Sequence, residues 1–226
     1  EQFSKGNTPK STGDDYAMSI YPQAAQGVWI GLWDAGLNFY DRKEDKMYQF
    51  AESSDHQADF KLIPLVVIRE TDDPAGGTFL WVGTRGNGLF QLKFTPETHQ
   101  LTLVKHFQYQ SSGNNSAISS NFITSAFTDS KGQFWVTTEN GLNRFDPARQ
   151  LFEQFVHTPN LPTPILQATL EDSKGRLWIS TQNGIASVLP TGKNLQTSVY
   201  DNRDGLTDQF FNSDAMVSTP DGQFLF

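Results

Sequence analysis

Cysteine is absent from the 226-residue sequence. Its absence excludes disulfide bonds, thiolate metal sites and a cysteine nucleophile from this chain. Basic residues are also scarce: 17 lysines and arginines stand against 25 aspartates and glutamates, which gives a formal net charge of -8. A chain with this charge and no basic cluster repels a phosphate backbone, so we expect no nucleic-acid partner.

Long apolar runs are missing as well. The longest, LIPLVVI at 62–68, has the length of a strand and contains a proline, whereas a membrane helix needs about 20 apolar residues. We therefore expect no direct membrane insertion by this segment. Hydrophobic residues still make up 37% of the chain, with 18 phenylalanines, a composition typical of a folded protein with a sizeable core.

The sequence contains one unit that is repeated along the chain. The two most similar copies, 127–146 and 170–185, share Asp-Ser-Lys-Gly, a tryptophan and then Asn-Gly. Earlier copies lie at 27–41 and 77–89, and the start of a fifth lies at 216–226. Four tryptophans occupy one position of the unit, at separations of 52, 54 and 43 residues: Trp29, Trp81, Trp135 and Trp178. Such a period is typical of the blades of a β-propeller.

Each unit contains four short β-type runs separated by turn residues, which predicts a four-stranded antiparallel blade. The predicted fold is all-β: a β-propeller segment of about four complete blades with partial blades at each end. The repeated tryptophans are expected to pack between blades rather than to bind sugars. The whole of 1–226 is expected to be one propeller fragment, with blades at 16–50, 62–109, 122–155 and 165–200, a partial blade at 210–226, and the last strand of a preceding blade at 1–3.

Two turns of the unit differ in character. Asp129-Ser-Lys-Gly132 and Asp172-Ser-Lys-Gly175 predict tight first hairpins, because aspartate can bond the turn backbone and glycine tolerates positive φ. The second hairpin ends in Asn-Gly in the third and fourth units and is one residue longer in the first two. Second hairpins and blade connections share one face of a propeller, so we expect the variable residues on that face.

The candidate ligand site consists of residues of the second hairpins. Trp33 lies outside the repeated tryptophan position and stands beside Asp34. An aromatic ring with carboxylate, guanidinium and amide groups is typical of a site for a carbohydrate or another small polar ligand. The alternative is that these are ordinary solvated turn residues. The predicted ligand-binding residues are Trp33, Asp34, Arg85, Asn87, Glu139, Asn140, Gln182 and Asn183.

No catalytic residue, metal site or cofactor is predicted. Asp129 and Asp172 recur with the repeat and are interpreted as turn formers, and nothing in the sequence predicts a carboxylate pair at glycosidase spacing. The sequence also has no calcium loop, phosphate-binding glycine motif or nucleophile elbow. Four histidines lack metal-ligand spacing: His56, His99, His106 and His157.

The unit resembles the two-component-regulator propeller repeat, which has a hydrophobic strand, Asp-x-x-Gly-x-hydrophobic-Trp-Ile-Gly-Thr and then x-x-Gly-Leu-x-x-Phe-Asp. The stretch 115–121 also resembles the family's blade lead-in, and 204–212 resembles its lead-in to the last blade of a propeller. Leu32 departs from the pattern where threonine is usual, and Thr137 and Ser180 replace glycine. The matching residues are Asp129, Gly132, Trp135, Gly141, Leu142, Phe145 and Asp146 in the third unit, and Asp172, Gly175, Trp178, Ile179, Thr181 and Gly184 in the fourth.

The resemblance implies an extracytoplasmic sensor, joined through a membrane helix to a histidine kinase or diguanylate cyclase. The chain is then expected to be a periplasmic, non-catalytic ligand-sensing module of a membrane-anchored signal transduction protein. Its expected partners are a small polar ligand, such as an oligosaccharide, and either a second copy or the remaining blades of the parent propeller. Two alternatives stay open: the propeller of a polysaccharide-active lyase or glycosidase, and a purely structural or dimerisation propeller.

Overall fold

The computed structural model describes residues 6, 11–23, 26–50, 65–73, 75–111, 117–156, 161, 163–191, 194–207 and 210–226. These residues form four four-stranded antiparallel sheets, one two-stranded sheet and one short 3-10 helix. The all-β prediction with four-stranded blades is confirmed. The chain divides into two compact units, Glu1–Phe107 and Gln108–Phe226. None of the helical segments in the described ranges has the length and hydropathy of a membrane-spanning helix.

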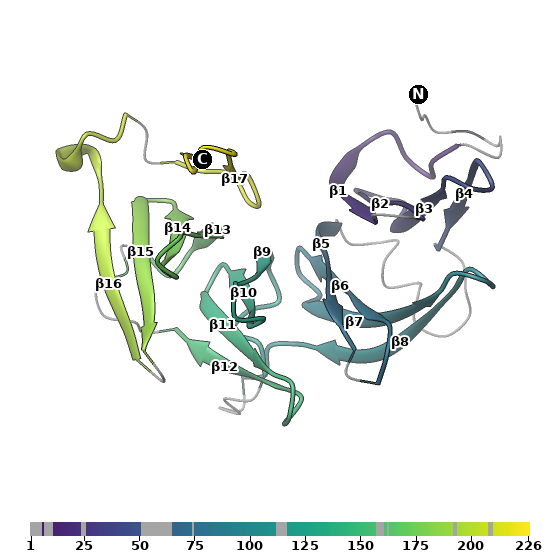
Figure 1. Ribbon diagram of the computed structural model, residues 1–226, viewed down its shortest axis with the longest axis horizontal. Helices are drawn as coiled ribbons and strands as arrows, with labels where there is room; N and C mark the ends of the chain where they lie inside the picture. Colours follow the sequence, from purple (N-terminus) through teal and green to yellow (C-terminus); the bar gives the residue numbers. More distant parts are fainter. Residues whose placement is uncertain are drawn as a thin grey trace. The chain divides into compact units, whose positions relative to one another are not determined.

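The N-terminal unit holds two sheets in which each strand pairs with the next one in sequence (Figure 1). The predicted strand at 1–3 and the start of the predicted second blade, 62–64, lie outside the described residues. The first sheet consists of β1 (Ala17–Gln23), β2 (Gly27–Leu32), β3 (Leu37–Asp41) and β4 (Lys46–Gln49), and the second of β5 (Leu65–Asp72), β6 (Thr78–Thr84), β7 (Leu89–Thr95) and β8 (Gln100–Phe107).

The C-terminal unit repeats this meander twice and then begins another sheet. Residues 166–171 form an edge strand, although their local propensity also suits a helix. The elements of the C-terminal unit are β9 (Ile123–Thr128), β10 (Phe134–Thr138), β11 (Gly141–Asp146) and β12 (Leu151–Phe155), then β13 (Leu166–Glu171), β14 (Leu177–Thr181), β15 (Gly184–Thr191) and β16 (Asn194–Tyr200), followed by η1 (Asn202–Asp204), β17 (Val217–Ser218) and β18 (Phe224–Leu225).

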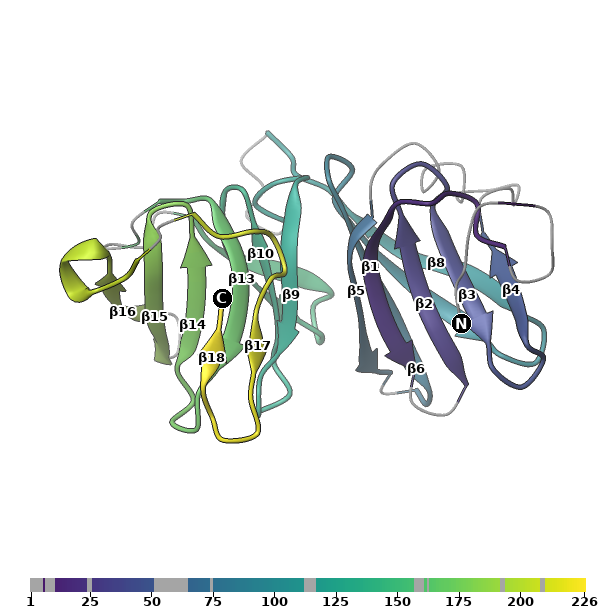
Figure 2. The same cartoon turned by 90° about the horizontal axis from the view of Figure 1, so that it is seen from above.

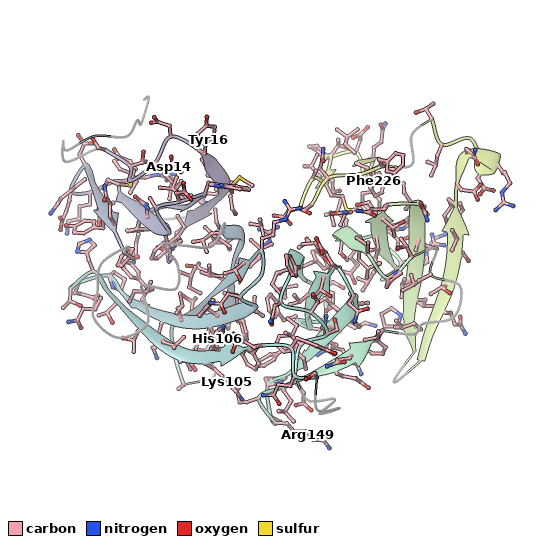
Figure 3. The ribbon with its side chains drawn as sticks, turned by 180° about the vertical axis from the view of Figure 1, so that it is seen from behind. Asp14, Tyr16, Lys105, His106, Arg149 and Phe226 are labelled. Carbon is pink, nitrogen blue, oxygen red and sulfur yellow. The ribbon has the colours of Figure 1, made fainter. Side chains whose placement is uncertain are left out.

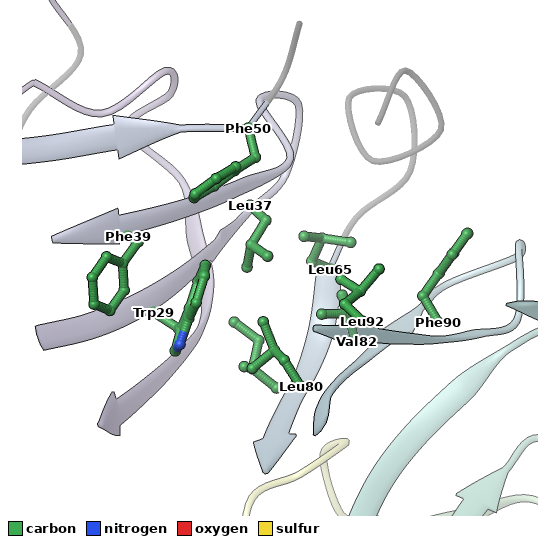
Figure 4. Packing of buried hydrophobic residues seen from close by; sticks show 10 residues of the cluster. Trp29, Leu37, Phe39, Phe50, Leu65, Leu80, Val82, Phe90 and Leu92 are labelled. Carbon is green, nitrogen blue, oxygen red and sulfur yellow. The ribbon is translucent and has the colours of Figure 1, made fainter. Parts of the chain in front are cut away.

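A buried cluster joins the two sheets of the N-terminal unit (Figure 4). Trp29 of β2 is 0% exposed, and its ring centroid lies 4.8 Å from that of Phe94 in β7. The first sheet therefore buries its repeated tryptophan against the second sheet. The buried members of the cluster are Trp29, Leu37, Phe39, Phe50, Leu65, Ile68, Leu80, Val82, Phe90 and Leu92.

The C-terminal unit uses the same packing between consecutive sheets. Trp135 of β10 is buried in a cluster with Leu166, Leu177 and Ile179 of the next sheet. Trp178 of β14 lies 6.3 Å, centroid to centroid, from Phe224 of β18, and Figure 2 shows the β17–β18 hairpin beside the β13–β16 sheet. Within each unit, a tryptophan on the second strand of one sheet thus contacts the sheet that follows.

The first hairpins explain why aspartate precedes this tryptophan by six residues. Asp129 Oδ1 accepts hydrogen bonds from the backbone N–H groups of Lys131 and Gln133, at 3.0 and 2.8 Å. Its Oδ2 accepts one from the indole N–H of Trp135, at 2.9 Å. Asp172 makes the same three kinds of bond in the next sheet. One carboxylate therefore closes the turn and also satisfies the polar atom of the packing tryptophan.

The Asp172 carboxylate predicts a pH-dependent contribution to stability. Burial alone would raise its pKa, but hydrogen bonds from Trp178 and Arg176 outweigh burial and lower the pKa from 3.8 to about 2. A carboxyl group whose pKa is lower in the folded state stabilises the fold above its unfolded pKa, and this contribution is lost as the pH falls through the folded pKa. We expect Asp172→Asn to reduce the free energy of unfolding by about 1 kcal/mol at pH 7.

Urea unfolding measures the free energy of unfolding of the unmodified protein and of Asp172→Asn. The difference between these two free energies should shrink as the pH falls from about 4 towards about 2. A difference that stays constant over this range would contradict the assigned role of the carboxylate.

Candidate functional site

A threonine at the end of the second strand fixes the second hairpin in three of the four sheets. Thr181 Oγ1 donates a hydrogen bond to the Gly184 carbonyl at 2.9 Å and accepts one from the Asn183 N–H at 3.0 Å. Thr84 and Thr138 make the same pair of bonds in their own hairpins. Because the threonine holds the hairpin backbone, side chains at the hairpin tip are free to vary without loss of the turn.

The first sheet lacks this threonine and anchors its hairpin differently. Leu32, which takes its place, is buried and offers no hydroxyl. The Trp33 N–H donates to the Tyr16 carbonyl at 3.0 Å, as the Glu139 N–H does to the Phe122 carbonyl in the third sheet. In addition, the Asp34 N–H donates to Asp14 Oδ2 at 3.2 Å. The lead-in to β1 therefore supports the hairpin that carries Trp33. Figure 3 labels Asp14 and Tyr16 at the start of this strand.

Two exposed aromatic side chains stand at this end of the first sheet. Trp33 is 41% exposed and Tyr16 is 72% exposed. Their backbones are joined by the hydrogen bond from Trp33, and the carboxylates of Asp14 and Asp34 flank them in sequence. Exposed aromatic rings beside carboxylates can contact the apolar face and the hydroxyls of a sugar. Tyr16 is a member of the candidate site that the sequence reasoning missed.

The second sheet contributes Arg85 and Asn87. Arg85 is exposed at the hairpin tip, and Asn87 is half-buried. The carbonyl oxygen of Asn87 lies 2.6 Å from Nε2 of His106, whose ring stacks on Phe90 at a centroid distance of 3.9 Å. Asn87 is thus held by its backbone, and Arg85 presents a guanidinium group to solvent.

In the C-terminal unit the predicted residues divide between structural and exposed positions. Asn140 donates from Nδ2 to the Ser119 carbonyl at 3.2 Å, so its side chain joins the hairpin to the lead-in of its own sheet. Glu139 is half-buried, while Gln182 and Asn183 are exposed. The eight predicted residues come from four hairpins, two in each compact unit. Whether they bind a ligand stays a prediction.

A different group of potential ligand atoms lies at the β3–β4 and β7–β8 hairpins of the N-terminal unit. One ligand atom each from Asp41, Glu44 and His99 lies within 4.8 Å of the others. His99 Nε2 and Asp41 Oδ2 are 3.0 Å apart, and the His99 ring stacks on Tyr48 with a centroid distance of 3.7 Å. The sequence predicted no metal site because these residues are far apart along the chain.

The repeats of the C-terminal unit match a known family. The model of the family described as two component regulator propeller matches residues 117–140 and 160–183. The chain carries two-component regulator propeller repeats. These repeats include the Asp129 and Asp172 turns and the two packing tryptophans, although the match ends before β11 and β15. No curated protein matches the chain in sequence.

Solved structures with similar propellers include two extracellular domains from B. thetaiotaomicron. One, from a protein assigned as a hybrid two component system, is 28% identical, with a TM-score of 0.68, over 92% of this chain and 26% of that chain. The other, also assigned to a hybrid two component system, is 18% identical, with a TM-score of 0.65, over 96% of this chain and 28% of that one. The chain therefore spans about a quarter of the length of these relatives.

An enzyme shares the same fold. Virginiamycin B lyase from Staphylococcus aureus is 14% identical, with a TM-score of 0.56, over 84% of this chain and 57% of that chain. At this identity the similarity shows the fold alone. The chain is thus similar in sequence and structure to an extracellular two-component domain and similar only in fold to a lyase.

Asn140 and Asn183 occupy the same position of the propeller repeat and provide a matched test of structural roles. We expect Asn140→Ala to lower the free energy of unfolding by about 1 kcal/mol, because the Ser119 carbonyl loses its side-chain donor. The exposed Asn183 should tolerate alanine within about 0.5 kcal/mol. Urea unfolding of both variants measures the difference. Equal effects would contradict the division into structural and exposed hairpin residues.

Proposed function

We propose that the chain is part of an extracytoplasmic, non-catalytic sensing module of a membrane-anchored two-component-type protein. The observation that carries the proposal is the 28% identity to an extracellular two-component domain over 92% of this chain. The matching repeats of the same family support it. The ligand that fits the exposed groups best is a small polar molecule such as an oligosaccharide.

The second hairpins of the N-terminal unit are the part of the described structure best suited to ligand contact. Tyr16 and Trp33 present exposed aromatic surface, and the exposed Arg85 adds a donor for hydroxyl or carboxylate groups. The rings add contact area with few rotatable bonds, so little conformational entropy is lost on binding. The underlying hairpins are held by backbone hydrogen bonds, which keeps the contact surface preorganised.

The proposed mechanism is a shift between two packing arrangements of the parent sensor. A ligand that binds one arrangement more tightly than the other increases the population of that arrangement. In a membrane-anchored parent, this shift would change the association of two copies and so the output of the cytoplasmic domain. The fold shared with virginiamycin B lyase does not by itself favour catalysis, because one fold supports many functions.

Binding to a panel of defined neutral and uronic-acid-containing oligosaccharides tests the proposal. We expect saturable binding of at least one member, measured by isothermal titration calorimetry, and recovery of that oligosaccharide unchanged. The double variant Trp33→Ala, Arg85→Ala should weaken this binding by at least about 10-fold, because alanine removes the aromatic contact and a charged hydrogen-bond donor. The double variant Tyr109→Ala, Arg149→Ala removes an exposed aromatic ring and an exposed arginine of the other unit; it is the matched control and should bind as the unmodified protein does.

Absence of binding by every member of the panel, or equal binding by the Trp33, Arg85 variant, would contradict the proposed site. Cleavage of the bound oligosaccharide would contradict the non-catalytic role and favour the polysaccharide-active alternative.

A further inference from the structure

We propose that Asp41, Glu44 and His99 bind one divalent transition-metal ion of the Zn²⁺ class between the two sheets of the N-terminal unit. The proposal concerns the β3–β4 and β7–β8 hairpins and does not depend on the sensing role proposed above. Asp41 and Glu44 belong to the first sheet's hairpin, and His99 belongs to that of the second sheet. A bound ion would join the two sheets through their hairpins.

The ligand atoms lie at a separation that one ion can bridge. In a tetrahedral Zn²⁺ site with bonds of about 2.0–2.2 Å, neighbouring ligand atoms are roughly 3.3 Å apart. His99 Nε2 and Asp41 Oδ2 lie 3.0 Å apart, and the Glu44 carboxylate oxygen completes a group within 4.8 Å. Glu44 is exposed, so an ion can reach its carboxylate from solvent.

The surrounding contacts orient these ligand atoms. Asp41 Oδ1 accepts backbone hydrogen bonds from Lys43 and Glu44, at 2.8 and 3.0 Å, which directs Oδ2 towards His99. Tyr48 donates its hydroxyl proton to Glu44 Oε2, and its ring stacks on the imidazole with an interplanar angle of 9°. Outer partners of this kind fix the orientation of ligands in metal sites.

The fold does not itself require an imidazole at position 99. His99 has a φ of 50°, the left-handed conformation at the end of the hairpin. Asp45 and Gln150 occupy the equivalent hairpin position in the first and third sheets, with φ values of 54° and 56°. The same hairpin thus forms with three different residues, and of these three only His99 supplies a nitrogen ligand facing a carboxylate of the neighbouring sheet.

One imidazole nitrogen and two carboxylate oxygens suit Zn²⁺ and related transition metals. Mg²⁺ and Ca²⁺ prefer six or more oxygen ligands and are not expected to bind here with comparable affinity. A bound ion takes the lone pair of His99 Nε2, so the proton of the neutral ring lies on Nδ1. The hydrogen bond between His99 Nε2 and Asp41 Oδ2 is then replaced by one bond from each of these two atoms to the ion. A fourth position remains for water.

Titration of the chelator-treated full chain with ZnCl₂, followed by calorimetry, tests the proposal. We expect one saturable equivalent, no comparable binding of Mg²⁺, and a rise in the unfolding temperature of several degrees at saturating Zn²⁺. His99→Gln should weaken Zn²⁺ binding at least about 10-fold. This change introduces the residue found at position 150, so the hairpin is expected to be retained. His106→Gln controls for adventitious binding by another imidazole and should leave the affinity unchanged.

Co²⁺ added to the unmodified chain provides a measurement that needs no variant. A strong visible absorption band at one equivalent, displaced by Zn²⁺, is expected for a tetrahedral site with protein ligands. Failure of Zn²⁺ to bind, equal affinity in the His99→Gln variant, or a Co²⁺ spectrum no different from that of the aqueous ion would overturn the proposal.

Discussion

A tryptophan on the second strand of a sheet, buried against the sheet that follows, is the contact on which the structure depends. Trp29 and Trp135 make this contact within their respective units, and each is at most 1% exposed. A large aromatic side chain at this place removes apolar surface of both sheets from water. In the third and fourth sheets, an aspartate accepts the hydrogen bond of the indole N–H, so this donor of the packing tryptophan has a partner.

This packing separates the structural part of the repeat from the part that can vary. The sheets and their first hairpins are fixed by the core and by the aspartate turns, whereas the second hairpins are held mainly by backbone bonds and the strand-end threonine. Side chains such as Trp33 and Arg85 can therefore change without cost to the sheet. The fold supplies a rigid support, and in proteins generally the binding residues lie disproportionately on loops held by such a support.

Much of the fold could be predicted from the sequence because its signals are local and repeated. Asp129 and Gly132 define a turn by themselves, and the alignment of 165–170 with 123–127 favours a strand over the helix that local propensity allows. The candidate site was less predictable. Tyr16 is recognised only when the register of β1 on β2, in which Ala17 pairs with Leu32, places it opposite Trp33.

The cluster of Asp41, Glu44 and His99 could not be predicted at all. Asp41 and His99 are 58 residues apart in sequence, and they meet only because two sheets pack with their hairpins at the same end. Neither the repeat nor the spacing of histidines contains that information. The replacement of the hairpin threonine by Leu32 is visible in the sequence, but the hydrogen bond from the Asp34 N–H to Asp14 is seen only in the structure.

The central claim is that the repeated tryptophans hold consecutive sheets together, and urea unfolding of Trp135→Ala tests it most directly. Removing this buried side chain should lower the free energy of unfolding by about 3–5 kcal/mol. Tyr109→Ala, at a residue of the same unit that is 49% exposed, should change it by about 0.5 kcal/mol or less. A loss below about 1 kcal/mol for Trp135→Ala, similar to that of the exposed control, would contradict the claim.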